Sequence, residues 1–230
     1  MVEEKLDITV HTFMGSITPE TVNKMVHEVE TAIVANDNYV YLRMSSPGGE
    51  VASAIAAYNC LIPYSDRIIT HNLATADSAS MMIFLAGDHR VASPESSFLV
   101  HPVSRVLNGP QTITSRKAHE MYESLESDEN RMCRIVASRT KFREQEYRTM
   151  MQTAKTLPAP FARRKGVIQD IVTPDKLPMN YVAEAFRSKL RVSGVPARQS
   201  IVDSIGSHAG TLVRIGMWVA GQIDADGYLS

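Results

Sequence analysis

The chain has 230 residues, of which 44% are hydrophobic and 21% charged, and its formal net charge at pH 7 is −1. This length and composition are typical of a globular protein with a sizeable core, and the balanced charge gives no basic surface of the kind that binds nucleic acid. No apolar run approaches the roughly 20 residues that cross a bilayer, so we expect neither nucleic acid nor membrane as a partner.

Strand and helix patterns alternate along the first part of the chain. They follow one another as strand 6–13, helix 18–35, strand 39–44, helix 51–61, strand 67–73 and helix 78–86. Thr18 as N-cap and Pro19 at the first helical position mark the start of the first helix. Alternation at this spacing is typical of βαβ units, so we expect an α/β fold with a mainly parallel sheet.

The later part of the chain is mainly helical in pattern. Its expected elements are a short strand 98–100, a turn at 108–110, helices 115–140 and 143–153, a proline-bearing corner at 157–160 and the segment 166–172. The run after residue 190 has a linker-like composition. We therefore expect an α/β domain over residues 1–190 and a C-terminal extension over residues 191–230, whose role the sequence does not indicate.

The two cysteines, Cys60 and Cys133, lie inside helical patterns and lack metal-ligand spacing. The acidic start at residues 1–5 is not a signal peptide. We expect buried thiols in a reducing compartment, and hence a cytoplasmic protein without a metal or another cofactor.

Two strand-to-helix turns carry residues that suit acyl-transfer chemistry. The run S-S-P-G-G ends at Gly49, whose backbone N–H would point outward as an oxyanion donor. The run A-T-A-D-S-A-S-M places Ser78 at the start of a helix, and the strand 98–100 leads to His101. A glycine donor, a serine and a histidine are parts of a serine acyl-transfer site. Each also has a structural alternative, namely a glycine turn, a helix cap and a core histidine.

These motifs, in this order and spacing, resemble the Clp protease proteolytic subunit, ClpP, of the ClpP/crotonase superfamily over about residues 6–186. Alignment of Ala86-Gly87 on the family's A-G without gaps places the nucleophile on Ser78. Ser80 is the alternative, because A-S-M at residues 79–81 copies a family motif, but it requires a deletion inside a buried helix. The resemblance implies stacked βαβ units and a protruding helical handle within residues 103–140; an ordinary surface helix there is nearly as good an interpretation of the sequence alone.

The resemblance implies a serine peptidase. Ser78 would attack a peptide carbonyl, His101 would act as its base, and the N–H groups of Gly49 and Ala79 would hold the oxyanion, with Ala79 favoured by its place at a helix N-terminus. Peptides or unfolded proteins are the implied substrates, and a homo-oligomeric ring is the implied assembly.

Three features depart from the family pattern. Ala154 takes the position of the triad aspartate, so the acid member is missing. Asp77 stands where the family has a small apolar residue, and we expect it to be a bystander or to perturb a neighbouring pKa. The chain also starts almost at its first strand, without the family's N-terminal axial segment, which weakens the expectation of an AAA+ unfoldase partner.

Three functions follow, in descending order of preference. The first is a ClpP-like serine peptidase, working through Ser78 and His101 alone. The second is a catalytically weak or silent scaffold subunit, which the missing aspartate favours and the retained serine and histidine oppose. The third is a crotonase-type acyl-CoA enzyme, which usually takes its acid or base from carboxylates and needs no serine and histidine in this order.

Overall fold

The computed structural model describes residues 8–36, 39–107, 109–110 and 112–173. Its main sheet runs in the order β1-β2-β3-β4-β7, and each neighbouring pair on this path is parallel. These strands are β1 (Ile8–Met14), β2 (Tyr39–Ser46), β3 (Ile68–Ala76), β4 (His89–Ala92) and β7 (Asp170–Ile171). Parallel strands joined through helices confirm the predicted α/β class.

A second, smaller sheet begins at the end of β3. There Thr75 pairs with Ser97 of β5 (Ser97–Val100), and β5 pairs antiparallel with β6 (Lys155–Pro158). The sequence predicted β5 to within one residue, but it gave only a proline corner near β6 and no strand at β4. Four-residue strands carry too little alternation to be recognised by pattern.

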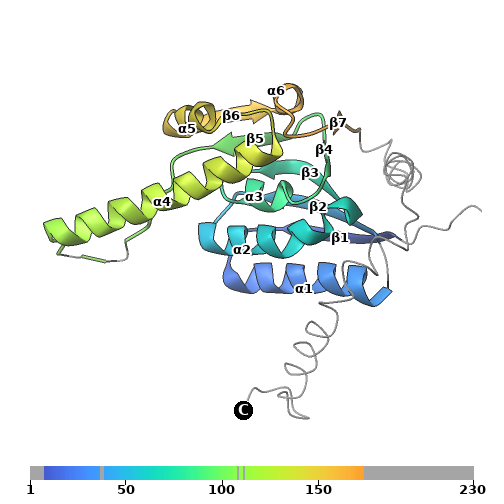
Figure 1. Cartoon of the computed structure of the whole chain (residues 1–230), viewed down its shortest axis with the longest axis horizontal. Coiled ribbons are helices and arrows are strands. Elements are labelled where there is room, and N and C mark those ends of the chain that lie inside the picture. The colour runs from blue at the N-terminus through green and yellow to red at the C-terminus, as the bar shows by residue number, and fades with distance from the viewer. Residues whose placement is uncertain (1–7, 37–38, 108, 111, 174–230) are drawn as a thin grey trace, which may run out of the picture. The chain divides into compact units, whose positions relative to one another are not determined.

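Three helices, α1 (Pro19–Asn36), α2 (Val51–Leu61) and α3 (Ser80–Phe84), lie on one side of the main sheet (Figure 1). The buried face of α1 follows helical spacing and consists of Val22, Met25, Val26, Val29 and Ile33. It belongs to one core cluster with the inward residues Val40, Leu42 and Met44 of β2. Each such side chain contributes about 1.5–3 kcal/mol by leaving water, so this interface is a main source of the fold's stability.

The helix α4 (Ser115–Arg139) projects beyond the sheets in Figure 1. The hydroxyl of Thr114 caps its start by accepting the Lys117 N–H at 3.2 Å. Its buried residues, Met132, Cys133 and Val136, all lie in its last two turns. The predicted helix 115–140 is therefore confirmed to within one residue, and most of its length makes no contribution to the core. Two shorter helices, α5 (Glu144–Gln152) and α6 (Ala159–Arg164), follow it.

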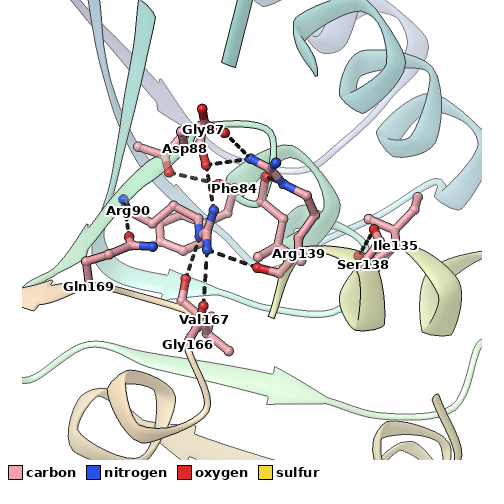
Figure 2. Close-up of polar contacts among 12 residues, drawn as sticks. Phe84, Gly87, Asp88, Arg90, Ile135, Ser138, Arg139, Gly166, Val167 and Gln169 are labelled. Carbon is pink, nitrogen blue, oxygen red and sulfur yellow. Dashed lines mark hydrogen bonds and ion pairs between the residues drawn. The ribbon is translucent and has the colours of Figure 1, made fainter. Parts of the chain in front are cut away.

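A buried arginine, Arg90, joins the base of α4 to the sheet (Figure 2). Its guanidinium donates to four carbonyls at 2.8–3.1 Å, those of Val167, Gly87, Arg139 and Gly166. Burial, and then the neighbouring Arg139 cation, lower the pKa of Arg90 to about 10, so the side chain remains charged at neutral pH. Because every one of these bonds is charge-assisted, the end of α4 is held rigidly on the core.

A buried histidine gives the fold a testable pH dependence. Both ring nitrogens of His71 are hydrogen-bonded, Nδ1 with the Tyr41 hydroxyl at 2.5 Å and Nε2 with the Ser93 hydroxyl at 3.1 Å. Burial, and then the Arg43 cation, lower the pKa of His71 from 6.5 to about 4. The His71 imidazole is therefore protonated near pH 6.5 in the unfolded chain but only near pH 4 in the folded protein.

We accordingly expect the free energy of unfolding to fall by about 3 kcal/mol as the pH drops from 6.5 to 4 because of His71. Urea unfolding at several pH values should show this loss on top of the effect of the carboxylates, and His71→Gln should lose less stability over the same window. Parallel curves for the two proteins would contradict the assignment.

No helix in the described part of the chain is both long and apolar enough to cross a membrane. The predicted boundary at residue 190 and the extension 191–230 lie outside the described residues, so both stay predictions.

Candidate active site

The predicted nucleophile, Ser78, lies on the turn between β3 and α3. Its backbone has a left-handed φ of +55°, which is uncommon for a residue other than glycine. Its N–H donates to the carbonyl of Leu99 in β5 at 2.7 Å. Left-handed residues of this kind cluster at functional turns, and this turn leaves Ser78 partly exposed.

Ser78, His101 and Gly49 line one cavity of about 490 Å³. The opposite wall comes from the segment after β5 and from α4; it includes Val103, Val106 and Leu125 and also the charged residues Arg105 and Asp128. The structure therefore brings three of the four predicted site residues to a single opening with both apolar and charged walls. Glu50, at the start of α2, also lines this cavity and was not singled out from the sequence.

The glycine corner owes its shape to two residues with positive φ, Gly48 at +94° and Gly49 at +148°. A Cβ on Gly48 would lie 2.7 Å from the Ser78 Cβ and 2.8 Å from the Asp77 carbonyl oxygen. Only glycine lets the backbone approach the serine turn this closely. The sequence signalled the paired glycines, but it could not show that Gly48 packs against the nucleophile turn.

Gly49 and Ala79 differ in their access to the cavity, because Gly49 lines it, whereas Ala79 is fully buried and is not among its lining residues. Their neighbours are occupied: Gly48 N–H donates to the Ser46 hydroxyl, and Glu50 N–H donates to the Ile17 carbonyl. Within the described residues, no protein acceptor takes the N–H of Gly49 or of Ala79. Unpaired backbone donors are rare, and an oxyanion hole is built from donors of this kind.

The catalytic interpretation of Ser78 depends on excluding Ser80. Ser80 is fully buried, and its hydroxyl donates to the carbonyls of Asp77 at 2.7 Å and Ser46 at 3.2 Å. Its proton is thus already engaged by two backbone acceptors. The predicted helix 78–86 was too long, because α3 begins only at Ser80. Ser78 therefore lies on a turn outside the helix, and the helix that follows Ala79 is too short to supply a large dipole.

His101 directly follows β5, and its side chain is hydrogen-bonded to the backbone of the next residue, Pro102. Its Nδ1 lies 2.8 Å from the Pro102 carbonyl oxygen. A carbonyl oxygen only accepts, so Nδ1 carries the proton and Nε2 presents a lone pair. Among the described residues no hydrogen bond joins His101 to Ser78, and such bonds often tighten only when substrate binds.

Ala154 directly precedes β6, the strand that pairs with β5. The antiparallel register ends at Val100↔Lys155, and His101 and Ala154 are the residues that adjoin this last pair. Ala154 has a left-handed φ of +48°, a conformation that asparagine and aspartate tolerate better than alanine. The position that the resemblance assigns to the triad acid thus adjoins the last residue pair of the two strands and carries a methyl group.

The described residues contain no cluster of three or more His, Cys, Asp or Glu side chains arranged to hold a metal ion.

Known proteins share sequence similarity with this chain. A family model described as Clp protease matches residues 4–175. The Clp protease proteolytic subunit 2 of Pseudomonas aeruginosa is 25% identical over 117 residues, which cover 49% of this chain and 58% of the relative. Subunit 3 of Rhizobium meliloti is 26% identical over 55% of this chain and 64% of its own length. Subunit 3 of Streptomyces avermitilis is 24% identical over 70% of this chain and 73% of its own length. The first two matches thus span less than two thirds of those relatives.

Proposed function

Because this chain belongs to the Clp protease family, we propose that it is a serine peptidase that cleaves peptide bonds with Ser78 as nucleophile and His101 as base. The observation that carries the proposal is the arrangement around one cavity. Ser78, His101 and Gly49 line it, and the N–H groups of Gly49 and Ala79 have no acceptor within the described residues.

The proposed chemistry begins when Ser78 Oγ attacks the carbonyl carbon of a peptide and His101 Nε2 takes its proton. The resulting oxyanion accepts hydrogen bonds from Gly49 and Ala79, each worth about 2.7–4 kcal/mol in the transition state. The imidazolium then gives the proton to the departing amine, and water hydrolyses the acyl-enzyme by the same steps. During each step the Pro102 carbonyl accepts the Nδ1–H bond and keeps the ring in the productive tautomer.

A carbonyl dipole stabilises an imidazolium less than a carboxylate does. In a complete Ser-His-Asp triad, substitution of the aspartate lowers turnover by about four orders of magnitude. We therefore propose slow hydrolysis by a Ser78–His101 dyad. The same methyl group at Ala154 favours one second candidate, a ClpP-like scaffold subunit with little or no activity of its own.

The proposed assembly is a homo-oligomeric ring that encloses the cavity. Four large apolar side chains on and around the first part of α4 are exposed, namely Val106, Leu107, Ile113 and Tyr122, with exposed fractions of 41–84%. A projecting arm that carries such side chains is typical of a symmetric contact. Peptides or unfolded protein segments are the proposed substrates, and an AAA+ unfoldase partner is not required for the cleavage of short peptides.

The experiment that tests the proposal adds the missing acid. Ala154→Asp should raise the kcat for a short fluorogenic peptide by at least about tenfold, because position 154 and His101 both adjoin the last pair of the β5–β6 ladder and a carboxylate near the ring would stabilise the His101 imidazolium. Ala154→Asn is the matched control, since it fits the same left-handed backbone without a charge. It should stay within about threefold of the wild-type rate.

Two results would count against the dyad. Wild-type protein that releases no product above background supports the scaffold instead. An Ala154→Asp protein that folds normally but is no faster than Ala154→Asn shows that position 154 does not reach His101.

A further inference from the structure

We propose that Asp77 is a positioning residue that fixes the distance between His101 and Ser78 by holding the backbone of β5. The proposal deepens the proposed peptidase function and rests on it. It also revises the expectation that Asp77 is a bystander, because its carboxylate has a specific partner in the strand that leads to the histidine.

The attachment of β5 to β3 is sparse. Only one residue pair, Thr75↔Ser97, joins the two strands in parallel register, and past that pair the chain leaves β3 for the nucleophile turn. The backbone carbonyl of Asp77 has turned away and accepts both the N–H and the hydroxyl of Ser80. The ladder therefore cannot continue through backbone groups alone.

The side chain of Asp77 restores the missing bond. Its Oδ1 accepts the N–H of Leu99 at 2.6 Å, and the Leu99 carbonyl accepts the N–H of Ser78 at 2.7 Å. The backbone N–H and the backbone carbonyl of Leu99 are thus both held by two consecutive residues, Asp77 and Ser78. Leu99 stands two residues before His101, so this clamp sets where the histidine leaves the sheet.

The Asp77 backbone is itself fixed. Its N–H donates to the Ser46 carbonyl at 3.0 Å, next to the glycine corner. Burial raises the pKa of Asp77, while the Leu99 N–H and the nearby His101 lower it. One residue therefore touches the glycine corner, the serine turn and the histidine strand, and a hydrogen bond to a charged acceptor is about twice as strong as one between neutral groups.

The test compares two variants that differ only in the acceptor. Asp77→Ala removes it, and we expect kcat to fall by about tenfold or more while KM changes by less than about threefold, since one charge-assisted bond is lost. Asp77→Asn keeps an oxygen acceptor and should recover most of the wild-type kcat. Thr75→Val is the matched control on the same strand; it removes only the bond from the Thr75 hydroxyl to the Ser46 carbonyl and should leave kcat and KM near wild type.

A second measurement does not depend on activity. Hydrogen exchange at the Leu99 amide should accelerate about tenfold or more in Asp77→Ala and stay slow in Asp77→Asn and in Thr75→Val. An Asp77→Ala protein with wild-type Leu99 exchange would overturn the proposal, whether or not the protein is a peptidase. An active wild-type enzyme whose kcat falls equally in Asp77→Asn and Asp77→Ala would also overturn it. Failure of the peptidase function alone would appear as an inactive wild type with the predicted exchange pattern intact.

Discussion

Ser78→Ala should lower kcat/KM for peptide hydrolysis by at least about a thousandfold, the scale on which serine enzymes lose activity with their nucleophile. The side chain lies at the cavity and outside α3, so its removal changes no core packing. We expect the variant to fold as the wild type does, with an unchanged melting temperature, and to fail only in chemistry. The loss is measured as hydrolysis of a fluorogenic peptide, in an assay sensitive enough to detect one turnover per enzyme molecule.

The matched control is Ser80→Ala. The Ser80 hydroxyl is buried against the carbonyls of Asp77 and Ser46, and both carbonyls keep other donors when it is removed. We therefore expect a loss of stability of about 1 kcal/mol and a kcat close to wild type. If instead Ser80→Ala abolishes hydrolysis and Ser78→Ala does not, the nucleophile has been assigned to the wrong serine.

Gly49→Ala should be the most damaging single change at the oxyanion corner. A Cβ at this position would lie 2.3 Å from the Ile17 carbonyl oxygen and 2.8 Å from the Ile17 nitrogen, with φ at +148°. The backbone has to shift to relieve these contacts, and the Gly49 N–H shifts with it. We expect kcat to fall by about 10²–10³-fold, the cost of one oxyanion donor, and the free energy of unfolding to fall by at least about 1–3 kcal/mol from backbone strain.

Gly15→Ala separates the two effects. Gly15 has a comparable φ of +124°, but nothing lies within 4 Å of the Cβ that would be added. This variant should therefore show the backbone strain without the contact at the site, with lower stability and near wild-type kcat. Equal losses of kcat in Gly15→Ala and Gly49→Ala would mean that the activity reports general destabilisation and not the oxyanion corner.

The architecture was predictable because its signals are local. Alternating strand and helix patterns indicated the parallel sheet, and the helical pattern of residues 115–140 predicted α4 to within one residue. The short strands β4 and β6 were missed, because β6 reads K-T-L-P and is recognisable only through its pairing with β5. The predicted helix 78–86 began two residues before α3 for a related reason. The left-handed conformation of Ser78 depends on contacts with β5 and the glycine corner, which sequence periodicity does not reveal.

The sequence indicated residues for the candidate site, but not the contacts between them. The spacing of Gly49, Ser78 and His101 reflects the family pattern, and these residues line one cavity. Three further features depend on contacts between distant segments: the close approach of Gly48 to Ser78, the engagement of the Ser80 hydroxyl and the Asp77 bond to Leu99. A further feature, the hydrogen bond from His101 Nδ1 to the Pro102 carbonyl, depends on the rotamer of the histidine side chain.

The most direct test of the account is to label the wild-type protein with a fluorophosphonate probe and to locate the adduct by peptide mass spectrometry. Such probes react with a serine only where a base and an oxyanion hole activate it. We predict a single adduct on Ser78, absent from Ser78→Ala and strongly reduced in His101→Ala. An adduct on Ser80, or no adduct on any serine of a folded protein, would contradict the assignment of Ser78 as an activated nucleophile.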